Sequence, residues 1–188
     1  MIQCYITDRR TLPPGQSFLS TIARNLAAGP DWIQIREKDL PARELYGFVR
    51  SALELPNPRG ARILVNSRVD VALAAGAGGA HLPSHAPPPH VWRDLMPAGF
   101  LFGVSCHTIE EVRAAERNGA SYVVFGPVFP PLSKRSDLSA RGLEQLERAS
   151  AAVKIPVLAL GGVTETNAGA CLSAGAAGVA GISRYQNG

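Results

Sequence analysis

Three charged residues that could bind and transform a phosphorylated molecule follow directly on an apolar segment. Residues 32–35 read WIQI, which predicts a buried strand, and Arg36, Glu37 and Lys38 come next. Arginine and lysine neutralise phosphate groups, and a glutamate can act as a general acid or base. A solvated surface cluster is the alternative interpretation. Charges placed directly after a buried strand are, however, more typical of a binding site.

Two glycine turns also follow apolar segments, at 156–160 and 178–180, that predict buried strands. Backbone without Cβ atoms allows peptide N–H groups to converge on an anion, so the two turns together predict a phosphate site. Tight turns with no ligand have the same composition, and that interpretation stays open. The residues of the two turns are Gly161, Gly162, Gly181, Ile182 and Ser183.

Other polar residues stand just after predicted strands. Asn66, Ser105 and His107 each follow an apolar run, and Lys134 lies in a segment that is long for a loop between a strand and a helix. We predict that this segment, 126–139, is a lid or binding loop. Asn66 would otherwise only turn the chain. For His107, and for His81 at the end of another apolar run, a structural hydrogen bond is the alternative to catalysis.

The elements that must position these residues alternate along the chain. Each predicted helix ends in Gly or Pro before the next apolar run, which favours parallel strands joined by right-handed crossovers. Eight such units predict a (βα)8 TIM barrel, with functional residues at the C-terminal ends of its strands; a doubly wound sheet is the alternative. The predicted strands are 3–6, 32–35, 62–65, 80–82, 101–104, 122–125, 156–160 and 178–180. The predicted helices lie at about 18–28, 41–53, 67–76, 91–95, 108–119, 140–150 and 162–175.

Local signals define several helix starts. Asp39 is predicted to cap the helix at 41–53, and Ser67 with Asp70 resembles a capping box, as does Thr108 with Glu111. After Ser183 the sequence is too short for a full eighth helix, so we expect that helix to be absent or shortened. A homodimer is one arrangement that would cover the resulting groove.

The size and composition of the chain limit the classes of protein to which it can belong. The chain of 188 residues predicts a single domain spanning 1–188, and it has no apolar run approaching ~18 residues and no recognisable signal peptide. We therefore expect a cytoplasmic protein with no membrane partner. The three cysteines are widely spaced and predict neither disulfides nor zinc. The net charge of +4 is mild and its arginines are scattered, which favours a small anionic molecule over nucleic acid.

Four segments carry specific motifs at these strand ends: DWIQIREKDL at 31–40, LVNSRVDVALAAGAGGAHL at 64–82, GVSCHTIEEVRAAERNGASYVVFGPVFPPLSK at 103–134 and PVLALGGVTETNAGACLSAGAAGVAGIS at 156–183. In these segments the chain closely resembles the thiamine phosphate synthase and TenI family. The resemblance implies a (βα)8 barrel in which the glycine turns hold the phosphate of a thiazole phosphate. In the synthase it further implies that Gln34 contacts an aminopyrimidine. The residues implied around the diphosphate are Arg36, Lys38, Asn66, Ser105, Ser133 and Lys134.

The synthase branch implies a Mg²⁺-dependent coupling of a pyrimidine diphosphate with a thiazole phosphate. Its acidic metal ligands would follow Asn66 and lie in the loop after His81, where this chain has Ser67 and Ala86. We therefore predict no metal ligands, and magnesium as a cofactor only if the chain is a synthase. Asp70 is the residue that a rearranged metal site would recruit.

The TenI branch implies a metal-independent thiazole tautomerase, which is the function we expect. Glu37 is the predicted acid or base. That branch places a histidine just after the sixth strand, where this chain has Pro127, and His107 is the substitute that we name. The alternatives are a working synthase and a protein that binds a phosphorylated ligand without turnover.

Overall fold

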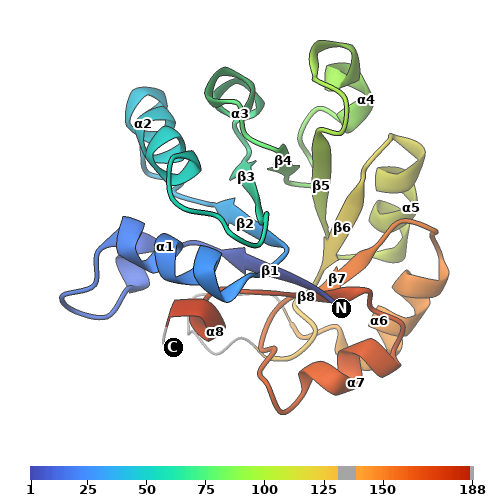
Figure 1. Cartoon of the computed structure of the whole chain (residues 1–188). Helices are drawn as coiled ribbons and strands as arrows, with labels where there is room; N and C mark the ends of the chain where they lie inside the picture. The colour runs from blue at the N-terminus through green and yellow to red at the C-terminus, as the bar shows by residue number, and fades with distance from the viewer. Residues whose placement is uncertain (131–138, 187–188) are drawn as a thin grey trace.

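Eight parallel strands close into a barrel in chain order, so the doubly wound alternative is wrong (Figure 1). The computed structural model describes residues 1–130 and 139–186; Ser133, Lys134 and most of the predicted lid lie outside that range. Each strand pairs in parallel with the next, and β8 pairs with β1. The strands are β1 (Ile2–Ile6), β2 (Trp32–Ile35), β3 (Arg62–Asn66), β4 (Gly79–Leu82), β5 (Leu101–Cys106), β6 (Tyr122–Phe125), β7 (Val157–Ala159) and β8 (Gly178–Gly181).

The helices surround the barrel and pack their apolar faces on it, as the ring of coiled ribbons in Figure 1 shows. Two short 3₁₀ helices, η1 (Arg9–Thr11) and η2 (Arg93–Leu95), complete the set. The α-helices are α1 (Phe18–Ala28), α2 (Ala42–Leu53), α3 (Val69–Ala75), α4 (Pro89–Trp92), α5 (Ile109–Arg117), α6 (Gly142–Ala151), α7 (Ala168–Ser173) and α8 (Ser183–Gln186).

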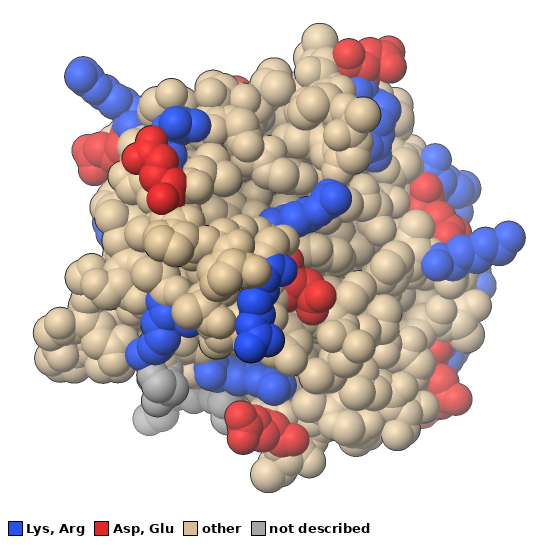
Figure 2. Space-filling view, viewed as in Figure 1, with Lys and Arg blue, Asp and Glu red and all other residues tan. Residues whose placement is uncertain are grey.

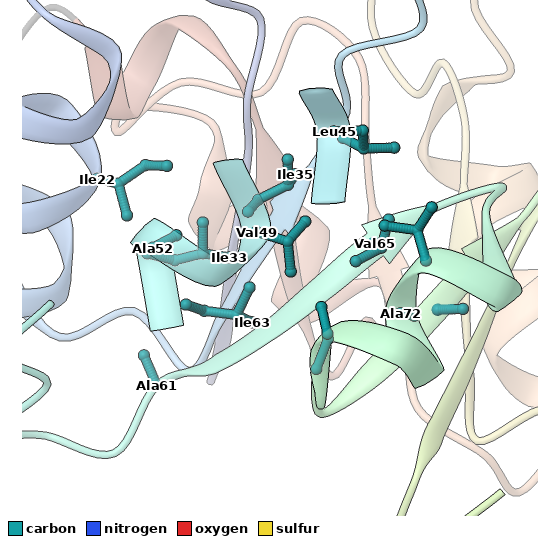
Figure 3. Packing of buried hydrophobic residues seen from close by; sticks show 14 of the residues in the cluster. Ile22, Ile33, Ile35, Leu45, Val49, Ala52, Ala61, Ile63, Val65 and Ala72 are labelled. Carbon is teal, nitrogen blue, oxygen red and sulfur yellow. The ribbon is translucent and has the colours of Figure 1, made fainter. Parts of the chain in front are cut away.

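The outer core lies between strands and helices. In the half around β2 and β3, Ile33, Ile35, Ile63 and Val65 point outward onto apolar residues of α1, α2 and α3 (Figure 3). A second cluster of the same kind lies around β6 and β7, where Val123 and Phe125 meet residues of α5 and α6 such as Leu146. Because successive side chains on a strand alternate faces, the residues between these outward positions point into the barrel.

The inner core is apolar on one side of the barrel and polar on the other. Residues of β1, β6, β7 and β8, together with Leu64, form the apolar part, with Ile6, Val124, Leu158 and Ala180 among them. The inward residues of β2 to β5 nearest the C-terminal ends are polar instead. They are Gln34, Asn66, His81 and Ser105.

The predicted helix caps were correct in one case and wrong in two. Thr108 and Glu111 form a capping box, as expected. Pro41, not Asp39, is the N-cap of α2, because the Asp39 carboxylate is drawn away by Arg9 in a 2.7 Å ion pair. The start of α3 has no side-chain cap.

At that start, Ser67 has a φ of 62° and precedes the N-cap residue, Arg68. Asp70 pairs with the Arg68 guanidinium rather than with the helix end. The Ser67 hydroxyl oxygen accepts from Asn66 Nδ2 over 2.9 Å instead of from the helix end.

The final helix, α8, is a single turn, which agrees with the shortened eighth helix that we predicted from the sequence. In α8, Tyr185 packs on Tyr5 with ring centroids 5.4 Å apart. The buried Gln186 donates from Nε2 to the carbonyl of Asp8 over 2.9 Å and accepts from the Thr11 hydroxyl over 2.8 Å. The chain itself therefore covers this part of β1 and η1, and the homodimer stays a prediction.

The surface in view carries charges of both signs. Figure 2 shows Lys and Arg side chains interspersed with Asp and Glu side chains over the face in view, not a continuous basic surface. Within residues 1–130 and 139–186, no helix combines the length and the apolar character needed to cross a bilayer.

Candidate active site at the mouth of the barrel

A cavity of about 650 Å³ opens where the strands end. The residues predicted to line the site come from strands far apart in the sequence, and the barrel brings them together because the carboxyl ends of all parallel strands meet at one rim. Of the predicted residues, the cavity is lined by Arg36, Glu37, Lys38, Asn66, Ser105, His107 and Ile182.

The floor of the cavity is formed by inward side chains from alternate strands, Ile6, Asn66, Ser105 and Leu160. Gln34 lies below this floor and is 1% exposed, and its Nε2 donates to Asn66 Oδ1 over 2.9 Å. Gln34 Oε1 is buried and has no hydrogen-bond partner among the described residues. An unsatisfied buried acceptor is costly, but Gln34 is not among the residues that line the cavity, so a ligand would reach this oxygen only after side chains of the floor move aside.

Glu37 borders the cavity, but its carboxylate is occupied. The Thr7 hydroxyl donates to Oε1 over 2.6 Å, and the Arg9 backbone N–H lies 3.2 Å from both oxygens. Arg9 Nη1 donates to Oε2 over 3.1 Å. The Thr7 hydroxyl in turn accepts from the Arg36 N–H over 2.9 Å. Glu37 therefore ties the end of β2 to the end of β1, and four hydrogen bonds hold its oxygens in place.

Arg36 and Lys38 remain without a carboxylate partner in the described part of the chain. The positive charge of Arg36, followed by partial burial, lowers the pKa of Lys38. Two neighbouring cations that repel each other are stabilised by an anion placed between them. Arg68 also borders the cavity, although its guanidinium donates to Asp70 over 2.8 Å.

His107 stands at the rim in a defined tautomer. Its Nδ1 lies 2.6 Å from the carbonyl oxygen of Gly126, which can only accept, so Nδ1 carries the proton. In the neutral ring Nε2 is then the atom with a free lone pair. A histidine in this state can take up or deliver a proton at Nε2.

His81 has the structural role that we weighed against catalysis. It lies below the floor and is 3% exposed, with Nε2 2.8 Å from Ser105 Oγ and Nδ1 3.1 Å from the Tyr122 hydroxyl. Burial, followed by the charge of Arg36, lowers the pKa of His81 to about 3, so the ring is neutral near pH 7.

The two glycine turns lie on neighbouring strands, since Ala159 of β7 is level with Val179 of β8. Gly161 and Gly162 have φ values of 95° and 61°, and a Cβ on either would meet the segment at 127–130 that follows β6. The first turn is therefore needed for close packing as well as for any ligand. A Cβ on Gly181, by contrast, would meet no atom within 4 Å.

The N–H groups of these turns are available. Among the described residues, neither the Gly162 N–H nor the Ser183 N–H donates a backbone hydrogen bond, and neither is bound by a side chain. Of the five predicted turn residues, Ile182 borders the cavity, and the other four are not among its lining residues.

The described residues of the mouth do not fit a metal ion held by protein carboxylates. Hard cations need oxygen ligands, normally from Asp or Glu. The described residues contain no group of three His, Cys, Asp or Glu side chains that could hold a metal. Glu37 is bound by Arg9 and Thr7, and Asp70, the carboxylate that a rearranged site would recruit, is bound by Arg68.

Two contributors were missed from the sequence. Thr7 and Arg9 hold Glu37, and Thr7 is the residue that directly follows β1. The rule that placed the other candidates, that functional residues follow barrel strands, would have selected Thr7 as well. Arg9 reaches the site through the conformation of η1, for which the sequence carries no comparable signal.

A closed (βα)8 barrel with polar side chains gathered at the carboxyl ends of its strands is the architecture of TIM-barrel enzymes. Within that class, the chain belongs to the thiamine monophosphate synthase family, whose model matches residues 3–185. The resemblance inferred from the four segments is thereby confirmed, and it places the chain in thiamine biosynthesis.

Individual relatives cover nearly the whole chain. It is 46% identical over 178 residues to a putative thiamine-phosphate synthase of Geobacter sulfurreducens, covering 95% of this chain and 83% of the relative. It is 40% identical to the thiamine-phosphate synthase of Chlorobium luteolum, covering 97% and 84% of the two chains. The solved thiamine phosphate pyrophosphorylase from Pyrococcus furiosus superposes with a TM-score of 0.84 at 36% identity, over 97% of this chain and 85% of that one.

Proposed function

We propose that this chain couples hydroxymethylpyrimidine diphosphate to a thiazole phosphate and releases diphosphate. The observation that carries the proposal is the pair Arg36 and Lys38, which face the mouth without a carboxylate partner among the described residues while Glu37 between them is bound to Arg9. The names of the relatives support this coupling reaction over the tautomerisation that the sequence motifs favoured.

In this reaction the bond between the pyrimidine methylene carbon and the diphosphate oxygen breaks, and the electron pair leaves with diphosphate. The thiazole nitrogen then donates its pair to the cationic methylene carbon, so no proton needs to move. Arg36 and Lys38 would stabilise the charge that develops on the leaving oxygens. Gln34 Oε1 would accept from the exocyclic amino group of the pyrimidine, and the N–H groups of the glycine turns would hold the thiazole phosphate.

The donor set of the described residues does not fit magnesium, so no step of this scheme is assigned to the metal. We assign neutralisation of the diphosphate to cationic side chains instead. Lysine and arginine can supply this charge directly, at the cost of less rigid geometry than a metal ion gives.

A tautomerase is the second candidate, and the tautomer of His107 is the observation that favours it. Tautomerisation of a thiazole needs a group that moves a proton. In that case we assign the transfer to His107 Nε2, since the oxygens of Glu37, the acid or base proposed from the sequence, accept four hydrogen bonds from Thr7 and Arg9.

The test is to mix the purified protein with both coupling substrates and, separately, with the thiazole phosphate tautomer, each with Mg²⁺ and with a chelator. We expect thiamine phosphate and diphosphate to form in equal amounts. Tautomer conversion without thiamine phosphate would establish the second candidate, and binding of the thiazole phosphate without either product would establish a non-catalytic binder.

His107→Gln separates the two reactions further. Loss of a general acid or base lowers a rate by about 10²–10⁴-fold. Tautomerisation should fall by this amount, whereas coupling, which moves no proton, should fall by less than about tenfold. His90→Gln is the matched control, because His90 is an exposed histidine outside the lining of the mouth.

A further inference from the structure

A chain of three side chains runs from the interior of the barrel to the floor of the mouth. Tyr122 on β6 is fully buried, His81 on β4 lies between it and the floor, and Ser105 on β5 lines the cavity. The two links are 3.1 Å from the Tyr122 hydroxyl to His81 Nδ1 and 2.8 Å from His81 Nε2 to Ser105 Oγ.

The glycine at 103 makes this arrangement possible. A Cβ at Gly103 would collide with the Tyr122 ring and its hydroxyl, and would lie 2.5 Å from His81 Nδ1. Gly103 on β5 lies level with His81, and because it has no side chain it leaves room for Tyr122 and His81 to meet.

The direction of the hydrogen bonds follows from counting donors. The neutral His81 ring has one N–H, and the Tyr122 O–H has no acceptor among the described residues other than His81 Nδ1. If Nδ1 carried the proton, the buried Tyr122 O–H would be left unsatisfied, which is unfavourable. Tyr122 therefore donates to Nδ1, and Nε2–H donates to Ser105 Oγ.

This direction determines what Ser105 presents to the cavity. A hydroxyl has one donor, and Ser105 Oγ already accepts from His81. Its proton is thus free to point into the mouth, which Arg36 and Lys38 also line.

We propose that Tyr122 and His81 are positioning residues that orient the Ser105 hydroxyl as a fixed donor to an anionic oxygen of the phosphorylated substrate. The proposal deepens the proposed function and rests on it for the identity of the ligand. The direction of the hydrogen bonds does not depend on that identity.

The first test therefore needs no ligand. In protein carrying ¹⁵N-labelled histidine, ring correlations identify which nitrogen of each neutral histidine bears the proton, and His81→Gln assigns the His81 signals by their disappearance. We expect His81 to be protonated at Nε2. Protonation at Nδ1 would overturn the proposal.

The second test measures binding of inorganic diphosphate by calorimetry. Ser105→Ala should weaken binding about tenfold, since a hydrogen bond to a charged group is lost. Tyr122→Phe should weaken it about threefold to tenfold by releasing the constraint on the His81 tautomer. The double variant should bind no more weakly than Ser105→Ala, because Tyr122 acts through Ser105. Additive losses, or unchanged binding in Tyr122→Phe, would contradict the proposal.

Tyr5→Phe is the matched control. Tyr5 is also a fully buried barrel tyrosine, but its hydroxyl contacts Gln186 and not the floor of the mouth. It should leave diphosphate affinity unchanged. If the unaltered protein fails to bind diphosphate at all, the anion site of the proposed function is wrong, and the His81 tautomer alone then decides the positioning role.

Discussion

The Glu37 carboxylate is bound on both oxygens by Arg9, whose backbone N–H lies 3.2 Å from each oxygen and whose Nη1 lies 3.1 Å from Oε2. Arg9 also donates to the exposed Asp39 over 2.7 Å and 2.8 Å. One arginine from η1 thus holds two carboxylates that follow β2. The charge of Glu37 is therefore neutralised by Arg9. The neighbouring side chains of Arg36 and Lys38 line the mouth and can bind an anion there.

Glu37→Gln should therefore lower the stability of the fold and have only a small effect on the rate of the catalysed reaction. Arg9 keeps Asp39 as a partner, but the substitution places a donor NH₂ where a buried oxygen accepts hydrogen bonds from Thr7 or Arg9, and we expect a loss of about 2 kcal/mol in the free energy of unfolding, measured by urea denaturation. Arg9→Met should give a similar loss. Asp39→Asn, which alters the exposed partner of the same arginine, is the control and should have a smaller effect. A stable Glu37→Gln protein with activity reduced more than about 100-fold would instead make Glu37 the acid or base.

Arg36 and Lys38 should each contribute to binding of diphosphate. We expect Arg36→Met and Lys38→Met to weaken its affinity about tenfold, because each removes a charge-assisted contact, and Lys154→Met to leave it unchanged. Calorimetry at low and high salt measures the effect, which should shrink as salt rises.

The pKa of Lys38 gives this pair a pH signature. Because Arg36 holds that pKa below the usual 10.5, Lys38 loses its proton earlier as pH rises, and diphosphate affinity should decline with it. In Arg36→Met the pKa of Lys38 should rise, and the decline should move to higher pH. An NMR titration of the Lys38 side chain follows both. No difference in the Lys38 titration between the two proteins would contradict the assignment.

The architecture was predictable because barrel strands buried on both faces leave a clear apolar signal. The pattern at 32–35 gave β2 with its observed bounds, and the glycine after residue 28 gave the end of α1, where Gly29 has a φ of 85°. Strand order was less certain, because the same alternation is compatible with a doubly wound sheet, and only the pairing of β8 with β1 excludes that arrangement. The caps at Asp39 and at Ser67 with Asp70 were mispredicted because Arg9 pairs with Asp39 and Arg68 pairs with Asp70, and sequence spacing does not encode either pair.

Which side chains meet at one cavity was predictable in part, but the contacts that each of them makes were not. The rule that functional residues follow strands gathered Arg36, Asn66 and Ser105 correctly around one cavity. The rule could not tell that Glu37 would be occupied by Arg9, which depends on how η1 folds back over the end of β2. Nor could it tell that His81 would connect Tyr122 to Ser105, since the three lie on different strands and meet only once the barrel closes.

The buried His81 should make the protein sensitive to acid. Its pKa is lowered from 6.5 to about 3 in the folded state, so between these values the unfolded chain binds a proton that the folded protein does not. Stability therefore falls as pH decreases from about 6.5 toward 3, and at pH 4.5 this group alone should cost about 2 kcal/mol relative to pH 7. Urea unfolding at both pH values should show a smaller difference in His81→Gln. His90→Gln, which alters an exposed histidine, should keep the full difference; equal pH dependence in all three proteins would refute the assignment.

The two glycine turns should respond differently to a methyl group. In Gly162→Ala the new Cβ would stand in a residue with a φ of 61°, against the Pro130 carbonyl and 2.7 Å from Phe129 Cβ, so we expect a loss of at least about 1–2 kcal/mol in stability. In Gly181→Ala the Cβ would meet no atom of the described protein within 4 Å, so the melting temperature should stay close to that of the unaltered chain. If peptide N–H groups at this turn bind the thiazole phosphate, the same methyl group should nevertheless weaken its binding by about tenfold, since backbone can approach an anion closely only without a Cβ.

Gly169→Ala in α7, where a Cβ likewise meets nothing within 4 Å, is the control and should change neither quantity. Calorimetric titration with the thiazole phosphate decides the matter: a Gly181→Ala protein that binds as tightly as the unaltered chain would mean that the second turn merely turns the chain.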